Sequence, residues 1–96
     1  MFWDIERLYV GEGASIGNVK QAVEGELRRQ GYVNVRHNDL EVAGNKGGTI
    51  ISTTFPTIGL SARIFYQMVI ASGEDFEAPK ATVGGMAAFI RDLRFL

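Results

Sequence analysis

Cysteine is absent from the 96-residue chain, and histidine occurs once, at position 37. The lack of cysteine excludes a disulfide framework, a thiolate metal site and a cysteine nucleophile. An excess of either charge is also missing, since the formal net charge is -1, and we therefore expect no nucleic-acid partner. The hydrophobic share of 46% is enough for one core, so we expect residues 1–96 to form a single domain.

Long apolar runs are missing as well. The longest run extends from Ile64 to Ala71 and is interrupted by Gln67. It is far shorter than the roughly 20 residues that a membrane-spanning helix needs. The first residues, Met1 to Arg7, have neither a basic leader nor a small-residue cleavage site, unlike a secretory signal peptide. We therefore expect a cytoplasmic protein without a membrane partner.

The stretch 61–72 is rich in β-branched and aromatic residues and contains no glycine or proline, which predicts the central strand of the fold. Side chains of a strand alternate between two faces. We expect one set to face the core: Ala62, Ile64, Tyr66, Met68 and Ile70. The other set mixes apolar and polar side chains: Arg63, Phe65, Gln67, Val69 and Ala71. Either another part of the same chain covers this mixed face, or a partner does.

The rest of the chain divides into five further elements and their connections. Alternating segments predict strands over residues 32–37 and 49–55, and helical spacing of apolar residues predicts helices over 18–30 and 79–93. Residues 2–10 fit neither pattern cleanly, because the apolar positions shift from Trp3 and Ile5 to Leu8 and Val10, and of strand and helix we choose a strand there. Gly31 is expected to end the first helix, and the glycine-rich segment 44–48 to form a hairpin turn. The short connection 56–59 predicts that strand 49–55 pairs antiparallel with strand 61–72.

These elements predict an α+β fold in the order β-α-β-β-β-α. The sheet is expected to be mostly antiparallel with three or four strands, and both helices are expected to pack on one face of it. Trp3 is expected to anchor the core, because large aromatic residues of small domains are usually buried. Gly84 and Gly85 weaken the last helix, which favours close packing on the sheet or a frayed first turn.

His37 is the obvious general-base candidate, because histidine exchanges protons most readily near neutral pH. No acid or nucleophile stands beside it in a catalytic pattern, since Asp39 and Glu41 are merely close in sequence. A pocket between sheet and helices is the alternative interpretation. Its expected lining consists of His37, Ser52, Thr54 and Tyr66.

Two other segments have some features of a ligand site. Residues 11–17 form a glycine loop before a helix, but no Gly-Lys-Ser/Thr follows, and Glu12 is negative where a phosphate would bind. The carboxylates of Glu74, Asp75 and Glu77 precede the last helix, where the helix dipole explains them. We therefore expect neither a cofactor nor a metal site.

The order of a helix, three antiparallel strands and a second helix between residues 18 and 94 resembles that of double-stranded-RNA-binding domains. That family carries a basic cluster at the start of its last helix. This chain has Glu74, Asp75 and Glu77 there, with the single Lys80. Because phosphate contacts need cations, we assign no family and expect no RNA binding.

The absence of any reactive constellation favours a non-enzymatic interaction domain that forms a homodimer or binds another protein. The expected interface is either the mixed sheet face, with Phe65, Gln67 and Val69, or the apolar C-terminus, Phe95 and Leu96. The alternative function is a small-molecule-binding protein or a minor enzyme that uses the pocket around His37.

Overall fold

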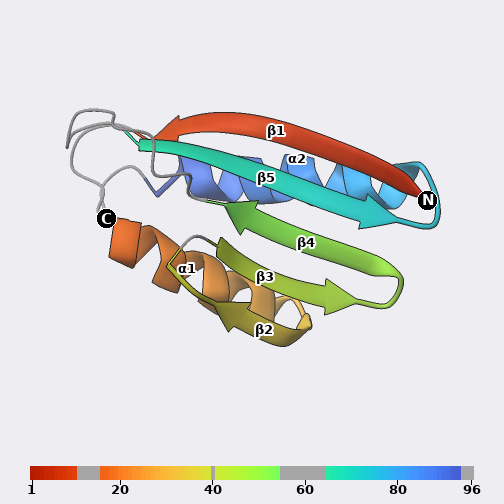
Figure 1. The fold of residues 1–96 in the computed structure, drawn as a ribbon, viewed down its shortest axis with the longest axis horizontal. Coiled ribbons are helices and arrows are strands. Elements are labelled where there is room, and N and C mark those ends of the chain that lie inside the picture. The colour runs from red at the N-terminus through yellow and green to blue at the C-terminus, as the bar shows by residue number, and fades with distance from the viewer. Residues whose placement is uncertain (11–15, 40, 55–64, 94–96) are drawn as a thin grey trace.

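A computed structural model describes residues 1–10, 16–39, 41–54 and 65–93, apart from the side chains of residues 9, 10, 16 and 65–67. In these ranges the chain forms five strands and two helices (Figure 1). The elements are β1 (Phe2–Val10), α1 (Ile16–Arg29), β2 (Val33–His37), β3 (Glu41–Lys46), β4 (Thr49–Thr54), β5 (Phe65–Gly73) and α2 (Glu77–Arg91).

The strands form one antiparallel sheet in the order β1-β5-β4-β3-β2. The first strand therefore lies at one edge, beside the last strand, and β2 forms the opposite edge. The predicted antiparallel pairing of β4 with β5 is confirmed from Ile50 opposite Ser72 to Thr54 opposite Met68. Neither helix in the described ranges has the length and apolar character needed to cross a bilayer.

The expected three or four strands are too few, because Glu41–Lys46 forms a strand of its own. The order within the described residues is β-α-β-β-β-β-α rather than β-α-β-β-β-α. Gly44, Asn45 and Lys46 have low strand preference, and the local sequence therefore favours a turn there. Pairing of all six β3 residues with β4 outweighs this local preference.

Both helices pack on the same face of the sheet, as expected, and in Figure 1 they lie behind the strands. The helices contribute Val19, Val23, Leu27, Val83, Met86, Ala87 and Ile90 to the core. The strands contribute Leu8, Val42, Ile51, Val69 and Ala71. Every one of these side chains is buried, and together they fill the layer between sheet and helices.

The prediction of which side of β5 faces the core is wrong for the described side chains. Val69 and Ala71 are buried in the core, whereas Met68 and Ile70 are partly exposed on the opposite face. Each set of alternating residues in β5 contains several apolar side chains, so hydrophobicity alone does not distinguish the two sets. Neighbouring β4 determines the side: its buried Ile51 lies opposite Ala71.

Gly31 ends α1 as predicted. It has a φ of +90°, and its N–H donates to the Arg28 carbonyl over 3.1 Å. The next N–H, of Tyr32, donates to the Leu27 carbonyl over 3.0 Å. This pair of bonds is the Schellman arrangement, which satisfies carbonyls that a helix end leaves without partners.

The start of α2 also follows the sequence, since a carboxylate of the acidic cluster supports the first turn. The Ala78 N–H donates to Asp75 Oδ1 over 2.7 Å. Close packing of Gly84 and Gly85 on the sheet is wrong, because both are exposed and a Cβ at either position would meet nothing within 4 Å. The two glycines therefore only weaken the exposed side of the helix.

Candidate functional site

The side of the sheet that faces away from the helices, called the open face below, is the first candidate site. It consists of three cross-strand rows, each running from β1 through β5 and β4 to β3. The first row is Trp3, Ser72, Ile50 and Asn45; the second is Ile5, Ile70, Ser52 and Ala43; the third is Arg7, Met68, Thr54 and Glu41. Neither helix covers these rows, because both pack on the other face.

Large apolar side chains are exposed on the open face. Trp3 is 68% exposed, Ile5 48% and Ile50 50%. The expected burial of Trp3 in the core is therefore wrong. Leu8 is the buried residue that determines the side of β1, and residues an odd number of positions before it lie on the opposite face. A contiguous apolar patch of this kind is typical of an interaction surface.

Two charged side chains stand at opposite ends of the third row. Arg7 is exposed on β1 and has no ion-pair partner among the described residues, and Glu41 is half-buried on β3. Glu41 Oε2 accepts a hydrogen bond of 2.7 Å from Ser52 Oγ. The hydroxyl of Thr54 is buried, and no described group bonds to it. The first two rows of the open face therefore combine large apolar side chains with small polar ones, and the third row carries opposite charges at its ends.

The expected interface residues are placed only in part. Val69 lies fully buried in the core of its own chain, so it is not a surface residue of the protomer. The side chains of Phe65 and Gln67, and residues 95 and 96, lie outside the described residues. Sequence reasoning missed Trp3 and Ile5 as surface residues, although their alternation with Leu8 carried the signal.

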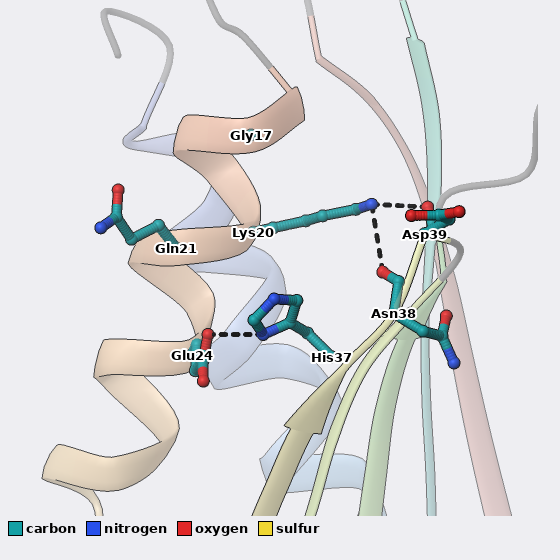
Figure 2. Close-up of a pocket in the computed structure, with 7 residues that line it drawn as sticks. All are labelled: Gly17, Lys20, Gln21, Glu24, His37, Asn38 and Asp39. Carbon is teal, nitrogen blue, oxygen red and sulfur yellow. Dashed lines mark hydrogen bonds and ion pairs between the residues drawn. The ribbon is translucent and has the colours of Figure 1, made fainter.

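A cleft between α1 and β2 is the second candidate site (Figure 2). Its volume is about 590 Å³. It is lined by Gly17, Lys20, Gln21, Glu24, His37, Asn38 and Asp39. In Figure 2 the Lys20 side chain extends from α1 toward the end of β2, and the His37 ring points toward Glu24.

The charged groups of this cleft bond to one another across it. His37 Nδ1 lies 2.9 Å from Glu24 Oε2, and the other oxygen of Glu24 lies 2.8 Å from an Arg28 nitrogen. Lys20 Nζ donates to the backbone carbonyls of Asn38 and Asp39 over 3.2 and 2.5 Å. These bonds tie α1 to the end of β2, and they engage the groups that would otherwise bind a charged ligand. No metal-binding group of three acidic, histidine or cysteine side chains occurs in the described part of the chain.

The pocket expected around His37 does not bring its residues together. Ser52 and Thr54 are on the open face, whereas His37 pairs with the core residue Val42 and contacts α1. The sheet therefore separates the two hydroxyls from the histidine. The side chain of Tyr66 is outside the described set.

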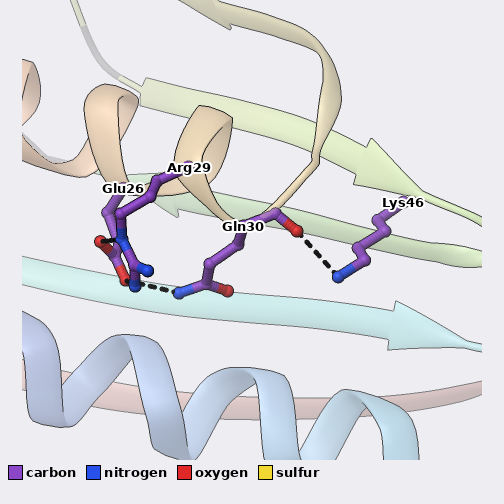
Figure 3. A network of polar contacts seen from close by, with 4 residues as sticks. All are labelled: Glu26, Arg29, Gln30 and Lys46. Atoms are coloured by element: carbon purple, nitrogen blue, oxygen red, sulfur yellow. Dashed lines mark hydrogen bonds and ion pairs between the residues drawn. The ribbon is translucent and has the colours of Figure 1, made fainter.

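A third polar cluster lies at the C-terminal end of α1 (Figure 3). Both oxygens of Glu26 accept hydrogen bonds from Arg29, at 2.7 and 2.5 Å, and Gln30 donates a third of 2.8 Å. The bonds from Arg29 and then Gln30 lower the pKa of Glu26 to about 2. Lys46 Nζ donates to the Gln30 carbonyl over 2.8 Å. This cluster joins the helix end to β3. A cleft of about 410 Å³ lies beside it, lined by Gln30, Tyr32, Lys46 and Thr49 together with residues 81, 82, 85 and 86 of α2.

The fold and these surfaces define a small α+β domain with a sheet face that neither helix covers and on which Trp3, Ile5 and Ile50 are exposed. No family model matches the chain, and neither a curated protein nor a solved structure does so. Any functional assignment therefore depends on the residues and geometry of this chain itself.

Proposed function

We propose that the protein is a non-enzymatic interaction domain that forms a homodimer through its open face. The observation that carries the proposal is the exposure of Trp3, Ile5 and Ile50 on a sheet face that neither helix covers. Transfer of apolar surface out of water is the main driving force of association. Covering this face with a second copy would bury all three side chains.

The size of the open face limits the dimer that it can form. The three rows span five residues along four strands, about 17 Å by 19 Å, which gives a flat area of roughly 320 Å². The relief of the side chains raises the area that a partner would bury. Stable interfaces bury roughly 600 to 1,000 Å² on each partner. The open face is therefore at the small end for a stable dimer, and the dimer depends on close packing of the exposed Trp3, Ile5 and Ile50.

The exposed edge of β1 is a less favourable place for self-association. If two β1 strands paired antiparallel in one continuous sheet, side chains of the same face would lie opposite each other. Registers centred on Asp4, Ile5 or Glu6 each place two of the acidic side chains of this strand opposite each other. Like charges opposite each other destabilise strand pairing, and natural edge strands use such charges to prevent it.

Sedimentation velocity of the wild type and two variants tests the proposal. We expect the wild type to sediment as a dimer and Trp3→Glu as a monomer, because the new carboxylate would be buried between the two copies. Phe76→Glu is the matched control, since Phe76 is 59% exposed but contacts Phe2 outside the open face. It should remain a dimer. A wild type that is monomeric at micromolar concentration would contradict the proposal.

Small-molecule binding in the cleft between α1 and β2 is the second candidate function. The volume of about 590 Å³ lies in the range of ligand pockets and favours this function. The engagement of Lys20, Glu24 and His37 in internal bonds opposes it. Native mass spectrometry of the purified protein separates the two functions: a retained mass that His37→Ala releases would support the second, and a dimer without an added mass supports the first.

A further inference from the structure

We propose that two copies stack open face to open face about a two-fold axis that runs parallel to the strands, between β4 and β5. In this arrangement Arg7 of each copy faces Glu41 of the other. The inference rests on the proposed homodimer and specifies how its two faces meet. Two features support it: the opposite charges at the two ends of the third row, and the sizes of the side chains in the other two rows.

The strand order determines which strands face each other. The open face of β1, β5, β4 and β3 is a set of four neighbouring strands. A two-fold axis between the middle two strands, β5 and β4, places β1 of one copy over β3 of the other, and β5 over β4. This rotation does not change the position of a residue along the strand direction. Each row of one copy therefore lies over the same row of the other copy, with the strand order reversed. Arg7 and Glu41 are the two ends of one row and therefore face each other twice in the dimer. Stacked sheets are rotated by about 30°, which long side chains at the ends of a row can accommodate.

The other two rows are complementary in size under the same rotation. Ile5 faces Ala43, which is 1% exposed and is the smallest side chain of its row. Ile50 faces Ser72, which is 3% exposed and is the smallest of its row. Neighbouring side chains of the same copy already cover Ala43 and Ser72, so Ile5 and Ile50 would pack over these small residues and the side chains around them rather than against tall side chains. Trp3 faces Asn45, whose amide oxygen can accept a hydrogen bond from the indole N–H.

The alternative two-fold axis, perpendicular to the strands in the plane between the sheets, is less favourable. It would place each strand over its own copy and the first row over the third. Arg7 would then face Trp3, and Glu41 would face Asn45. Burial of a carboxylate without a cation is strongly unfavourable, whereas a paired one is tolerated. The charges of the open face therefore select the parallel axis.

The two arrangements differ at β2. In the proposed dimer β2 lies outside the four overlapping strands and has no strand opposite it. Val33, which is 56% exposed and opposite Asn45 in the sheet, then remains accessible. With the perpendicular axis β2 would face β2, and Val33 would be buried. A substitution at Val33 consequently distinguishes the two axes.

Charge reversal tests the proposal. We expect Arg7→Glu and Glu41→Arg each to weaken dimerisation by at least about 30-fold, because each places two like charges opposite each other at both ends of the dimer. The double variant should dimerise within about threefold of the wild type. An equimolar mixture of the two single variants should form a heterodimer, since each copy then supplies the charge that the other lacks. Val33→Glu should stay within about twofold. Sedimentation equilibrium gives the dissociation constants, and native mass spectrometry identifies the heterodimer.

The outcomes separate this inference from the proposed function. A monomeric wild type would reject both. A dimeric wild type whose single variants stay dimeric, or are not rescued in the double variant and the mixture, would reject only the Arg7–Glu41 arrangement. Strong disruption by Val33→Glu would instead indicate the perpendicular axis. If charge reversal prevents folding, Arg7→Gln and Glu41→Gln serve in its place: their combined effect should equal that of either one alone, and additive effects would overturn the pairing.

Discussion

The Tyr32 N–H donates to the Leu27 carbonyl over 3.0 Å, and both side chains are buried in the core. A backbone bond between these two residues requires the chain to turn back at Gly31, whose φ is +90°. Because the bond and the apolar contact occur together, the end of α1 fixes where β2 enters the sheet. Lys46 adds to this junction with a hydrogen bond to the Gln30 carbonyl.

Gly31→Ala is expected to lower the free energy of unfolding by about 1 to 2 kcal/mol, because an L side chain in the left-handed region is strained. Urea denaturation measures the change. Gly25→Ala is the matched control: Gly25 lies within α1, and a Cβ there would meet nothing within 4 Å. The control should gain stability rather than lose it. Equal losses at the two positions would contradict this role of Gly31.

Gly84→Ala and Gly85→Ala are each expected to raise the free energy of unfolding by about 0.5 to 1 kcal/mol. Alanine has less backbone freedom in the unfolded chain, and a Cβ at either site meets no atom within 4 Å. Thermal unfolding followed by circular dichroism would report this as a higher midpoint. A lower midpoint for either variant would show that the surface of α2 is packed against something at that point.

Val69→Ala is expected to cost about 2 to 3 kcal/mol, because it removes two buried methyl groups and leaves a cavity in the core. Val33→Ala makes the same chemical change at a residue that is 56% exposed, and it should cost less than about 0.5 kcal/mol. Chemical denaturation of both variants gives the comparison. Similar small losses at the two sites would contradict the burial of Val69 in the core.

The Glu26 carboxylate predicts a modest dependence of stability on pH. Its pKa is lowered from 4.5 to about 2 in the folded chain by the bonds from Arg29 and Gln30. The folded state therefore binds this proton less readily than the unfolded state, so the contribution is complete above about pH 4.5 and is lost as the pH falls toward 2. We expect less than about 1 kcal/mol, because solvent screens a surface pair.

Urea denaturation at pH 6 and pH 3 checks this effect, with Glu26→Gln as the control. The variant should lose less stability than the wild type between the two pH values, since its amide does not titrate. An identical loss in both proteins would assign the acid sensitivity to other carboxylates.

The elements themselves were largely predictable from local patterns. The apolar stripe of α1 contains Val19, Val23 and Leu27, and all three are buried as their spacing predicts. Gly31 ends that helix for a reason that is visible in the sequence, because only glycine adopts its backbone conformation without strain. The pairing of β4 with β5 was predicted because the two segments follow each other in the chain. Each of these features depends on residues that are near one another in the chain.

The candidate sites were much less predictable, because they combine residues that are distant in the chain. His37 and Glu24 are 13 positions apart, and the crossing of α1 beneath the sheet brings them together. Arg7 and Glu41 share a row only because β5 and β4 lie between their strands. No local pattern contains either relationship.

The sequence by itself determined where the helices and most strands lie, through side-chain periodicity and the conformational freedom of glycine. Only the tertiary structure decided which side of each strand is the inside. Alternation divides the residues of β5 into two sets, each with several apolar side chains, and does not say which set the helices cover. Pairing with β4 and packing of the helices put Val69 in the core and Ile70 on the open face. β1 pairs with β5 so that Trp3 lies opposite Ser72, which is on the same face as Ile70. Trp3 therefore lies on the open face and is exposed.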